Sequence, residues 1–126
     1  MTGYFTTREL ACPCCGRQKF EDGFLAGLGA LRRGTGVAMP LTSACRCDPH
    51  NRAVRGHKRS LHRMTNSDHD CATIAVDVAM ADGNNKAVLT GAALHNGWSV
   101  GVAADFIHLD LRTKYLGLQQ RLFHYG

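Results

Sequence analysis

Two histidines and an aspartate stand in sequence contexts that suit a metal site. In the segment 106–110, alternation places an imidazole and a carboxylate, His108 and Asp110, on one side of a strand and aliphatic side chains on the other. Asp77 interrupts the apolar run Ile74–Val78, and a carboxylate buried there needs a partner. A lone histidine in a strand is more often structural than a ligand. Together with His62, however, these residues offer the two imidazoles and the carboxylate of a catalytic zinc site with one open position.

The apolar pattern predicts the elements that would position these residues. Helices are expected at Phe20–Arg33 and at about 85–95, and strands at Val37–Leu41, Ala72–Ala79, Trp98–Val102 and Phe106–Arg112. Between them, Asp48–Met64 is polar, basic and without a sustained period, which indicates a long surface segment. The expected fold class is α+β, with a small antiparallel sheet that carries the zinc site and is flanked by helices.

Length and composition limit the possible classes of protein. A chain of 126 residues predicts a single domain over 1–126, and 44% apolar with 20% charged residues is typical of a globular protein. The formal charge of +5 favours anionic polymers as partners without choosing among them. Neither a signal peptide nor a membrane span is readable, so we expect synthesis in the cytoplasm without a signal peptide and no membrane partner.

The cysteines allow a second metal site. Cys12 and Cys15 form a Cys-x-x-Cys pair, and Cys45 and Cys47 form a Cys-x-Cys pair on either side of Arg46. Four thiolates of this kind could hold a structural zinc ion. Disulfides and plain buried thiols are equally open at this stage.

The order of several short motifs resembles the zinc D-Ala-D-Ala carboxypeptidase family, whose members are peptidoglycan peptidases with the fold of the hedgehog signalling domain. The similarity covers most of the chain. It consists of the cysteine-containing opening at 9–16, the Ser-Ala-Cys-Arg segment at 43–46 with 50–54 after it, Ser-x-His at 60–62, Ala-x-Asp-aliphatic at 75–78 and His-x-Asp at 108–110. Each motif is weak alone, and their common order carries the resemblance.

Residue by residue, the resemblance implies roles for five positions. His62, Asp77 and His108 would bind Zn²⁺, and Asp105, three residues before the last histidine, would be the general base. Arg46 matches the arginine that the family places beside the substrate or the developing oxyanion. Asp110 is better interpreted as a carboxylate that orients an imidazole or Arg46 than as a ligand.

The chain departs from the family pattern between the first two ligands. Fourteen residues separate His62 from Asp77, which is more than the family usually has. The usual spacing would select His69, and Asp70 is a second rival for the same role. Asp77 is preferred because its small and aliphatic neighbours match the family strand, which makes 65–71 part of an insertion.

The function implied by this resemblance is zinc-dependent hydrolysis of peptide bonds in peptidoglycan stems or cross-bridges, next to D-alanine, by a D-alanyl endopeptidase or carboxypeptidase. The absence of a readable signal peptide suggests a phage lysis enzyme that reaches the bacterial cell wall and periplasm through virion or lysis partners, acts as a monomer and binds no nucleic acid. Alternatives are an L-Ala-D-Glu endopeptidase on the same scaffold, a basic zinc-binding module for nucleic acid, and an inactive wall-binding domain.

Overall fold

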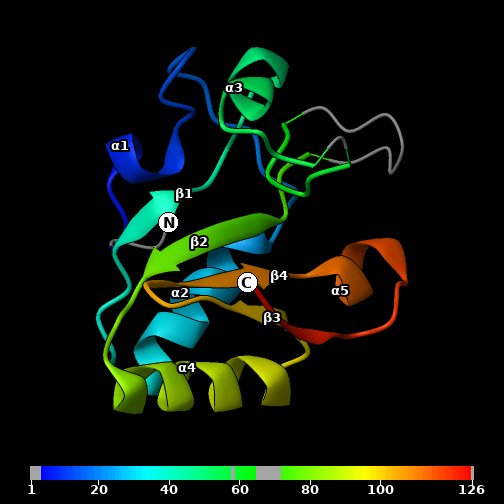
Figure 1. Cartoon of the computed structure of the whole chain (residues 1–126). Coiled ribbons are helices and arrows are strands. Elements are labelled where there is room, and N and C mark those ends of the chain that lie inside the picture. Colours follow the sequence, from blue (N-terminus) through cyan, green and yellow to red (C-terminus); the bar gives the residue numbers. More distant parts are fainter. Residues whose placement is uncertain (1–3, 58, 65–71, 126) are drawn as a thin grey trace.

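The computed structural model describes residues 4–57, 59–64 and 72–125. Its elements in chain order (Figure 1) are α1 Thr7–Leu10, α2 Phe24–Thr35, β1 Leu41–Ser43, α3 Asp48–Ala53, β2 Ala75–Ala79, α4 Gly83–His95, β3 Ser99–Val102, β4 Phe106–Asp110, α5 Arg112–Leu116 and β5 Leu122–His124.

A five-stranded sheet of order β1-β2-β4-β3-β5 organises the chain. The neighbouring pairs among β1, β2, β4 and β3 are antiparallel, whereas β5 runs parallel to β3 at the edge. This confirms the α+β class with a sheet flanked by helices. The sheet is mixed rather than wholly antiparallel because β5, which the sequence analysis did not predict, returns alongside β3.

The hydrophobic core lies between one face of the sheet and the helices α2 and α4. Phe24 and Leu28 of α2 are completely buried, as are Val76 of β2 and Ile107 of β4. In Figure 1, α2 passes behind the sheet and α4 runs below it. Since alternate strand residues point to opposite faces, packing this row into the core turns the other row of β2 and β4 away from α2.

That second row holds the chemistry-bearing residues. Asp77 of β2 is paired directly with His108 of β4, and His108 is paired in turn with Gly101 of β3. At the two ends of this row, Ser43 of β1 is opposite Asp77 and Phe123 of β5 is opposite Gly101. The register therefore brings residues from five strands onto one line across the sheet.

Several predicted bounds differ from the structure: the helix expected from Phe20 begins at Phe24, the strand expected from Ala72 begins at Ala75, and the last predicted strand ends at Asp110 rather than Arg112.

Two further differences have a clear local cause. β1 begins at Leu41 instead of Val37, because Pro40 has no N–H to donate and contributes only its carbonyl, which accepts from Ala79 N–H at 2.8 Å. The supposed surface segment Asp48–Met64 opens with the short helix α3. Asp48 and Pro49 are start signals typical of a helix, but six residues are too few to show a period.

Within the described residues, no helix is long and apolar enough to span a membrane.

Candidate metal centre

The strands and one loop bring His62, Asp77 and His108 together. Asp77 and His108 are direct neighbours on β2 and β4. His62 arrives from the loop before β2, whose backbone is fixed on both sides: Arg46 N–H donates to His62 O at 2.8 Å, and Ile74 N–H donates to Leu61 O at 3.0 Å. Residues far apart in the sequence thus meet through backbone pairing.

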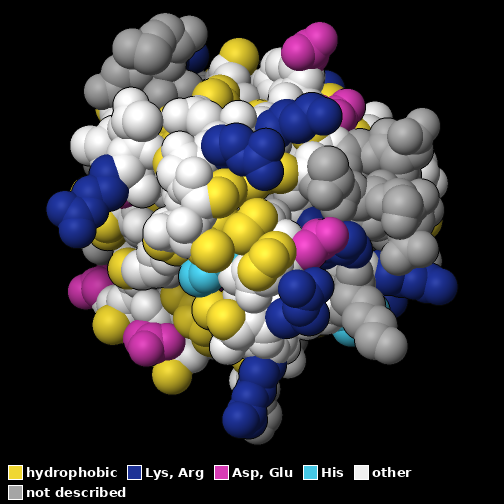
Figure 2. Space-filling view, turned by 90° about the horizontal axis from the view of Figure 1, so that it is seen from above, with side chains coloured by type: hydrophobic (Ala, Val, Ile, Leu, Met, Phe, Trp, Pro, Cys, Tyr) yellow, Lys and Arg dark blue, Asp and Glu magenta, His cyan; other side chains and the backbone are white. Residues whose placement is uncertain are grey.

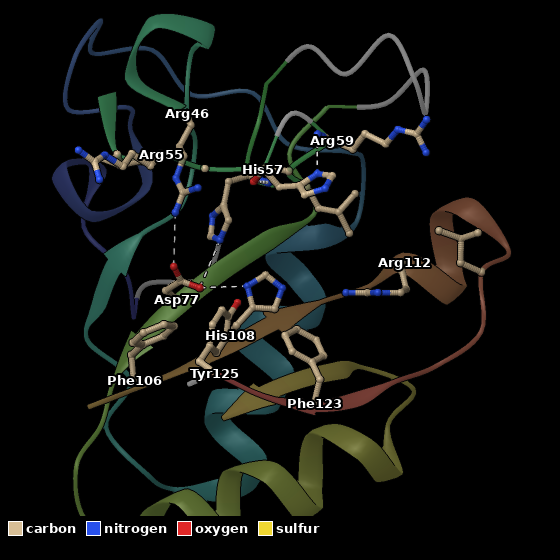
Figure 3. A pocket seen from close by; sticks show the side chains of 16 residues that line it. Arg46, Arg55, His57, Arg59, Asp77, Phe106, His108, Arg112, Phe123 and Tyr125 are labelled. Atoms are coloured by element: carbon tan, nitrogen blue, oxygen red, sulfur yellow. Dashed lines mark hydrogen bonds and ion pairs between the residues drawn. The ribbon is translucent and has the colours of Figure 1, made fainter. Parts of the chain in front are cut away.

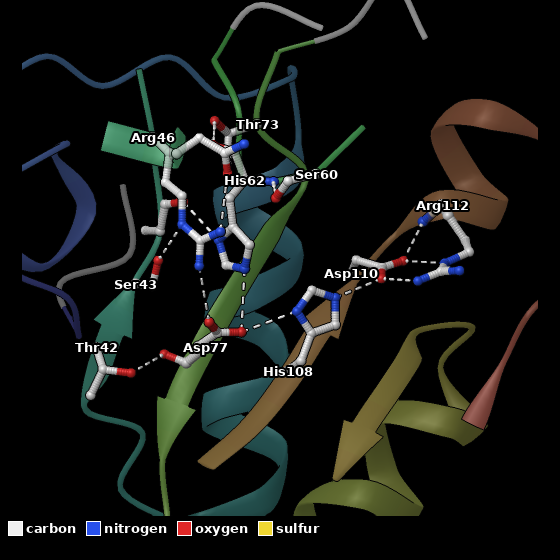
Figure 4. A network of polar contacts seen from close by, with 12 residues as sticks. Thr42, Ser43, Arg46, Ser60, His62, Thr73, Asp77, His108, Asp110 and Arg112 are labelled. Carbon is white, nitrogen blue, oxygen red and sulfur yellow. Dashed lines mark hydrogen bonds and ion pairs between the residues drawn. The ribbon is translucent and has the colours of Figure 1, made fainter. Parts of the chain in front are cut away.

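One atom of each residue points to a common centre (Figure 4). Asp77 Oδ1 lies 3.2 Å from His62 Nε2 and 3.0 Å from His108 Nδ1. The three atoms are all within 4.8 Å of one another. His62 and His108 are only 3% and 7% exposed, so both imidazoles are buried rather than on the surface.

The hydrogen bonds of His62 leave a place for a cation. Its Nδ1 lies 2.8 Å from the carbonyl oxygen of Ala44, which can only accept, so Nδ1 carries the hydrogen. Burial lowers the pKa of His62 despite its contact with Asp77, which favours the neutral ring. The Nε2 lone pair then faces the Asp77 carboxylate with no proton between them. Two acceptors at this distance fit a metal ion, and the His₂Asp donor set suits zinc.

His108 is oriented by a buried carboxylate. Its Nε2 donates to Asp110 Oδ2 at 2.8 Å, and Asp110, which is fully buried, also accepts from the Arg112 guanidinium at 2.6 and 2.9 Å. Burial raises the pKa of Asp110, but Arg112 and His108 outweigh it and hold the pKa at about 2. An ionised Asp110 that accepts from Nε2–H leaves Nδ1 as the ligand atom. This confirms the expectation that Asp110 orients an imidazole.

In the metal-free chain, His108 carries a proton on Nδ1, the nitrogen that faces Asp77. Burial alone would lower the pKa of His108, but hydrogen bonds with Asp110 and Asp77 raise it to about 8. Burial would likewise raise the pKa of Asp77, and its bonds with His108 and His62 reverse this and hold it below its ordinary value. Asp77 is therefore ionised, and a metal ion would have to displace the Nδ1 proton of His108.

Arg46, which the family resemblance places beside the substrate or the oxyanion, lies next to Asp77 in the structure. Its Nη2 lies 3.6 Å from Asp77 Oδ2, the oxygen that faces away from the imidazoles. Nε donates to Ser43 Oγ at 3.1 Å and Nη1 donates to Asn51 Oδ1 at 3.2 Å, which fixes the guanidinium. Burial lowers the pKa of Arg46, although Asp77 opposes this shift. The fixed cation lies next to the carboxylate that would bind the metal.

A cleft of about 570 Å³ opens over these residues (Figure 3). The three candidate ligands and Arg46 form part of its lining, and Arg55, Arg59 and Arg112 bring further positive charge. Apolar side chains complete the wall. The cleft is thus large enough for a peptide and rich in cations that would attract carboxylates.

Two aromatic residues that line this cleft, Phe123 and Tyr125, were not predicted from the sequence. The Phe123 ring lies over β3, 5.8 Å from the His108 ring between centroids, and only a glycine at 101 leaves room for it, since a Cβ there would stand 2.5 Å from Phe123 Cε2. Burial raises the pKa of Tyr125, and the charge of Asp77 raises it further. The alternation Leu122-Phe123-His124-Tyr125 was the signal for a strand that could have revealed both.

Asp105 is not brought to the centre. It is exposed in the turn between β3 and β4, where its carbonyl accepts from Met80 N–H at 2.9 Å, and it is not among the described residues that line the cleft. β4 begins only at Phe106, and a residue three positions before His108 does not belong to the row that faces the cleft. Its role as general base stays a prediction from sequence.

The rivals of Asp77, His69 and Asp70, lie outside the described residues with the rest of 65–71. Among the residues that the structure describes, Asp77 is the carboxylate that meets both imidazoles.

Comparison with known proteins identifies one family. The model of the family described as peptidase M15 matches residues 3–110. The match contains the three candidate ligands and Arg46 but ends before β5. No curated protein and no solved structure matches the chain.

Proposed function

The chain belongs to the peptidase M15 family of zinc-dependent metallopeptidases, and on this basis we propose that it hydrolyses peptide bonds of peptidoglycan stems or cross-bridges next to D-alanine. The observation that carries the proposal is the convergence of His62 Nε2, Asp77 Oδ1 and His108 Nδ1 at the base of a cleft. Zinc bound there would supply a water of lowered pKa and polarise the scissile carbonyl.

The other residues of the cleft would bind and orient the peptide. Peptidoglycan peptides carry carboxylates, and Arg55 and Arg59 place cations along the lining. The whole chain has a formal charge of +5, and lysine and arginine side chains surround an apolar area on the face seen in Figure 2. These features favour an anionic substrate on an electropositive protein.

Two donors are available for the developing oxyanion. The guanidinium of Arg46 is already fixed by Ser43 and Asn51, so it loses little freedom when it donates to the substrate. The hydroxyl of Tyr125 stays protonated because its pKa is raised, and it belongs to the same cleft. Either donor would stabilise negative charge on the scissile carbonyl oxygen.

The proton acceptor has two candidates. Asp105 is the residue implied by the sequence pattern and would need to turn from the β3–β4 loop towards the substrate. His57 lines the cleft, and its Nδ1 accepts from Arg59 N–H at 3.0 Å, which leaves Nε2 for the cleft. Replacing each residue in turn would distinguish them.

The biological setting forms part of the same proposal. The chain would act on the cell wall as a phage lysis enzyme that is delivered by the virion or by a lysis partner, and would act as a monomer. The formal charge of +5 and the arginines along the cleft support an anionic wall polymer as the partner.

Digestion of purified peptidoglycan tests the function. With zinc present, we expect soluble fragments whose masses identify a bond next to D-alanine, and excess chelator should abolish their release until zinc is restored. Asp77→Ala protein provides the matched control. Cleavage between L-Ala and D-Glu would select the alternative endopeptidase, and a zinc-loaded protein that binds peptidoglycan without cutting would indicate a non-catalytic module. Full activity without zinc would overturn the metallopeptidase mechanism.

A further inference from the structure

A second group of possible metal ligands lies outside the cleft. The Sγ atoms of Cys12, Cys15 and Cys47 are all within 4.8 Å of one another, and those of Cys12 and Cys47 are 3.6 Å apart. Cys12 is buried, Cys47 is partly buried and Cys15 is exposed. The cluster therefore has a buried side and an open side.

The backbone holds these sulfur atoms in place. Cys12 N–H donates to Arg17 O and Gly16 N–H donates to Cys12 O, both at 2.8 Å, which folds the loop back so that Cys15 meets Cys12. Gly16 has a φ of 74°, a left-handed conformation that glycine adopts without strain. Cys47 N–H also points at Cys12 Sγ at 3.4 Å. A backbone donor aimed at sulfur stabilises a thiolate.

Two neighbouring cysteines are arranged differently. Cys45 is completely buried, packs against Met64, and receives a hydrogen bond from Lys19 N–H at 3.4 Å. Cys14 is exposed and, like Cys45, does not belong to the group of described residues whose ligand atoms converge. Among the cysteines that the structure describes, three thiols are therefore clustered and two are not.

We propose that Cys12, Cys15 and Cys47 bind a second zinc ion, which is structural and separate from the centre at His62, Asp77 and His108. Thiolates are the ligands that zinc takes in structural sites, and binding releases the thiol protons without any change of oxidation state. Because the cluster is open to solvent at Cys15, a water molecule could reach the ion there and act as the fourth ligand.

Nearby charge supports this assignment. Arg17 lies close enough to interact with all three sulfur atoms and forms a hydrogen bond with Cys15. Three thiolates around Zn²⁺ carry a net negative charge, which this guanidinium would offset. The shape of the cluster and its charge thus favour the same occupant.

The proposed ion would also stabilise the backbone that carries Arg46 and His62. The extended segment 45–47 directs Cys47 to the cluster and, by alternation, Arg46 to the cleft. Arg46 is paired through its backbone with both His62 and Met64, at 2.8 and 3.0 Å. Fixing Cys47 to the loop 12–16 would therefore hold Arg46 and the strand-like turn that carries His62.

Metal content of the full chain tests the proposal. After purification with zinc, the wild-type protein should hold two zinc ions per chain, and Cys15→Ser and Asp77→Ala should each hold one. Cys14→Ser is the matched control, because it removes an exposed thiol from the same loop and should keep two. Both cysteines are exposed, so neither substitution disturbs the core.

Cobalt as a probe identifies which site is lost. The Co²⁺-loaded chain should show the thiolate-to-metal charge-transfer absorption, which Cys15→Ser loses while Asp77→Ala and Cys14→Ser keep it. The proposal is overturned if the wild-type protein lacks this absorption, if Cys15→Ser retains two zinc ions, or if thiol counting in denaturant and chelator reveals a Cys12–Cys47 disulfide. None of these results depends on wall hydrolysis, so failure of the proposed activity is a separate outcome.

Discussion

The two carboxylate oxygens of Asp77 contact different groups. Oδ1 faces both imidazoles, at 3.2 and 3.0 Å, whereas Oδ2 faces the Arg46 guanidinium at 3.6 Å. A metal ion taken up by Oδ1 therefore leaves the contact with Arg46 in place. The Asp77 carboxylate therefore contacts both the metal position and Arg46, which we propose as an oxyanion donor. This holds the Arg46 guanidinium at a fixed distance from the metal position.

The first prediction concerns the identity of the carboxylate ligand. Asp77→Ala should lose zinc from the centre, because it removes the oxygen shared by His62 and His108. Asp70→Ala and His69→Ala should retain this zinc. Metal content of the three proteins decides the assignment, each prepared with Cys15→Ser so that only one site is counted. An empty centre in Asp70→Ala with a full one in Asp77→Ala would transfer the ligand role to the insertion.

The second prediction separates the two candidate bases. Asp105→Asn and His57→Gln both remove a proton acceptor while keeping side-chain size, and neither residue is among the three clustered ligands. We expect bound zinc to be unchanged in both and hydrolysis to fall by about 10² to 10⁴ in the variant that lacks the base. If Asp105 is the base, its turn must move on substrate binding. Near-normal turnover in both variants would exclude both residues from the role.

At the scale of elements, β5 adds a wall to a site that the other strands already form. Phe123 and Tyr125 lie beyond the matched residues 3–110, yet both line the cleft. Tyr125 N–H donates to Val102 O at 2.9 Å, which continues the parallel pairing with β3 past His124. The peptide specificity of this chain would therefore depend partly on a segment outside the family match.

The third prediction tests this wall through a glycine. Gly101→Ala would place a Cβ 2.5 Å from Phe123 Cε2, so the Phe123 ring could no longer pack against β3 at this position. We expect a loss of about 1–3 kcal/mol in the free energy of unfolding and a higher KM. Gly91→Ala on the exposed face of α4 is the control, because a Cβ there meets nothing within 4 Å, and it should be neutral or stabilising by up to about 1 kcal/mol. Equal stability of the two variants would contradict the packing argument.

The sequence predicted the elements that have a clear period and missed those that depend on tertiary pairing. The helix α2 follows from helical spacing, β4 from alternation and β2 from a continuous apolar run, and the two strands give the row that holds Asp77 and His108. The helix α4 has no such period and was predicted from the Asn96-Gly97 pair that ends it. β5 is three residues long and half exposed, so its strand conformation depends on β3 being present. The cleft residues Phe123 and Tyr125 were missed for the same reason.

The positions of the site residues could be predicted only for those that lie on a strand. His62 came from a motif, since nothing in the polar loop around it has a period. Its placement depends on backbone bonds made across the fold, from Arg46 N–H to His62 O and from Ile74 N–H to Leu61 O. For Asp105, the motif gives a spacing in sequence but no direction, and the turn leaves the side chain exposed. A resemblance can supply the residue types, whereas their distances depend on how loops pack.

At the scale of the whole molecule, the protonation of two histidines makes the stability of the metal-free protein depend on pH near neutrality. His108 has a folded pKa of about 8, above its ordinary 6.5, whereas burial lowers the pKa of His62 below 6.5. Below pH 6.5 the unfolded chain binds a proton at His62 that the folded chain does not, so stability rises with pH. Between pH 6.5 and 8 the folded chain holds the His108 proton that the unfolded chain has lost, so stability falls with pH.

The fourth prediction is therefore a stability maximum near pH 6.5 for the protein in chelator, with a loss of about 1 kcal/mol by pH 8 as the stabilising effect of the His108 proton disappears. The zinc-loaded protein should behave in the opposite way over the same interval, because zinc competes with the proton on Nδ1 of His108 and binds more tightly as that proton leaves. Denaturant unfolding at several pH values, with chelator and with zinc, measures both trends. His108→Asn should remove the fall above pH 6.5 in chelator, and a metal-free wild-type protein that gains stability from pH 6.5 to 8 would show that the proton is not held between Asp77 and Asp110.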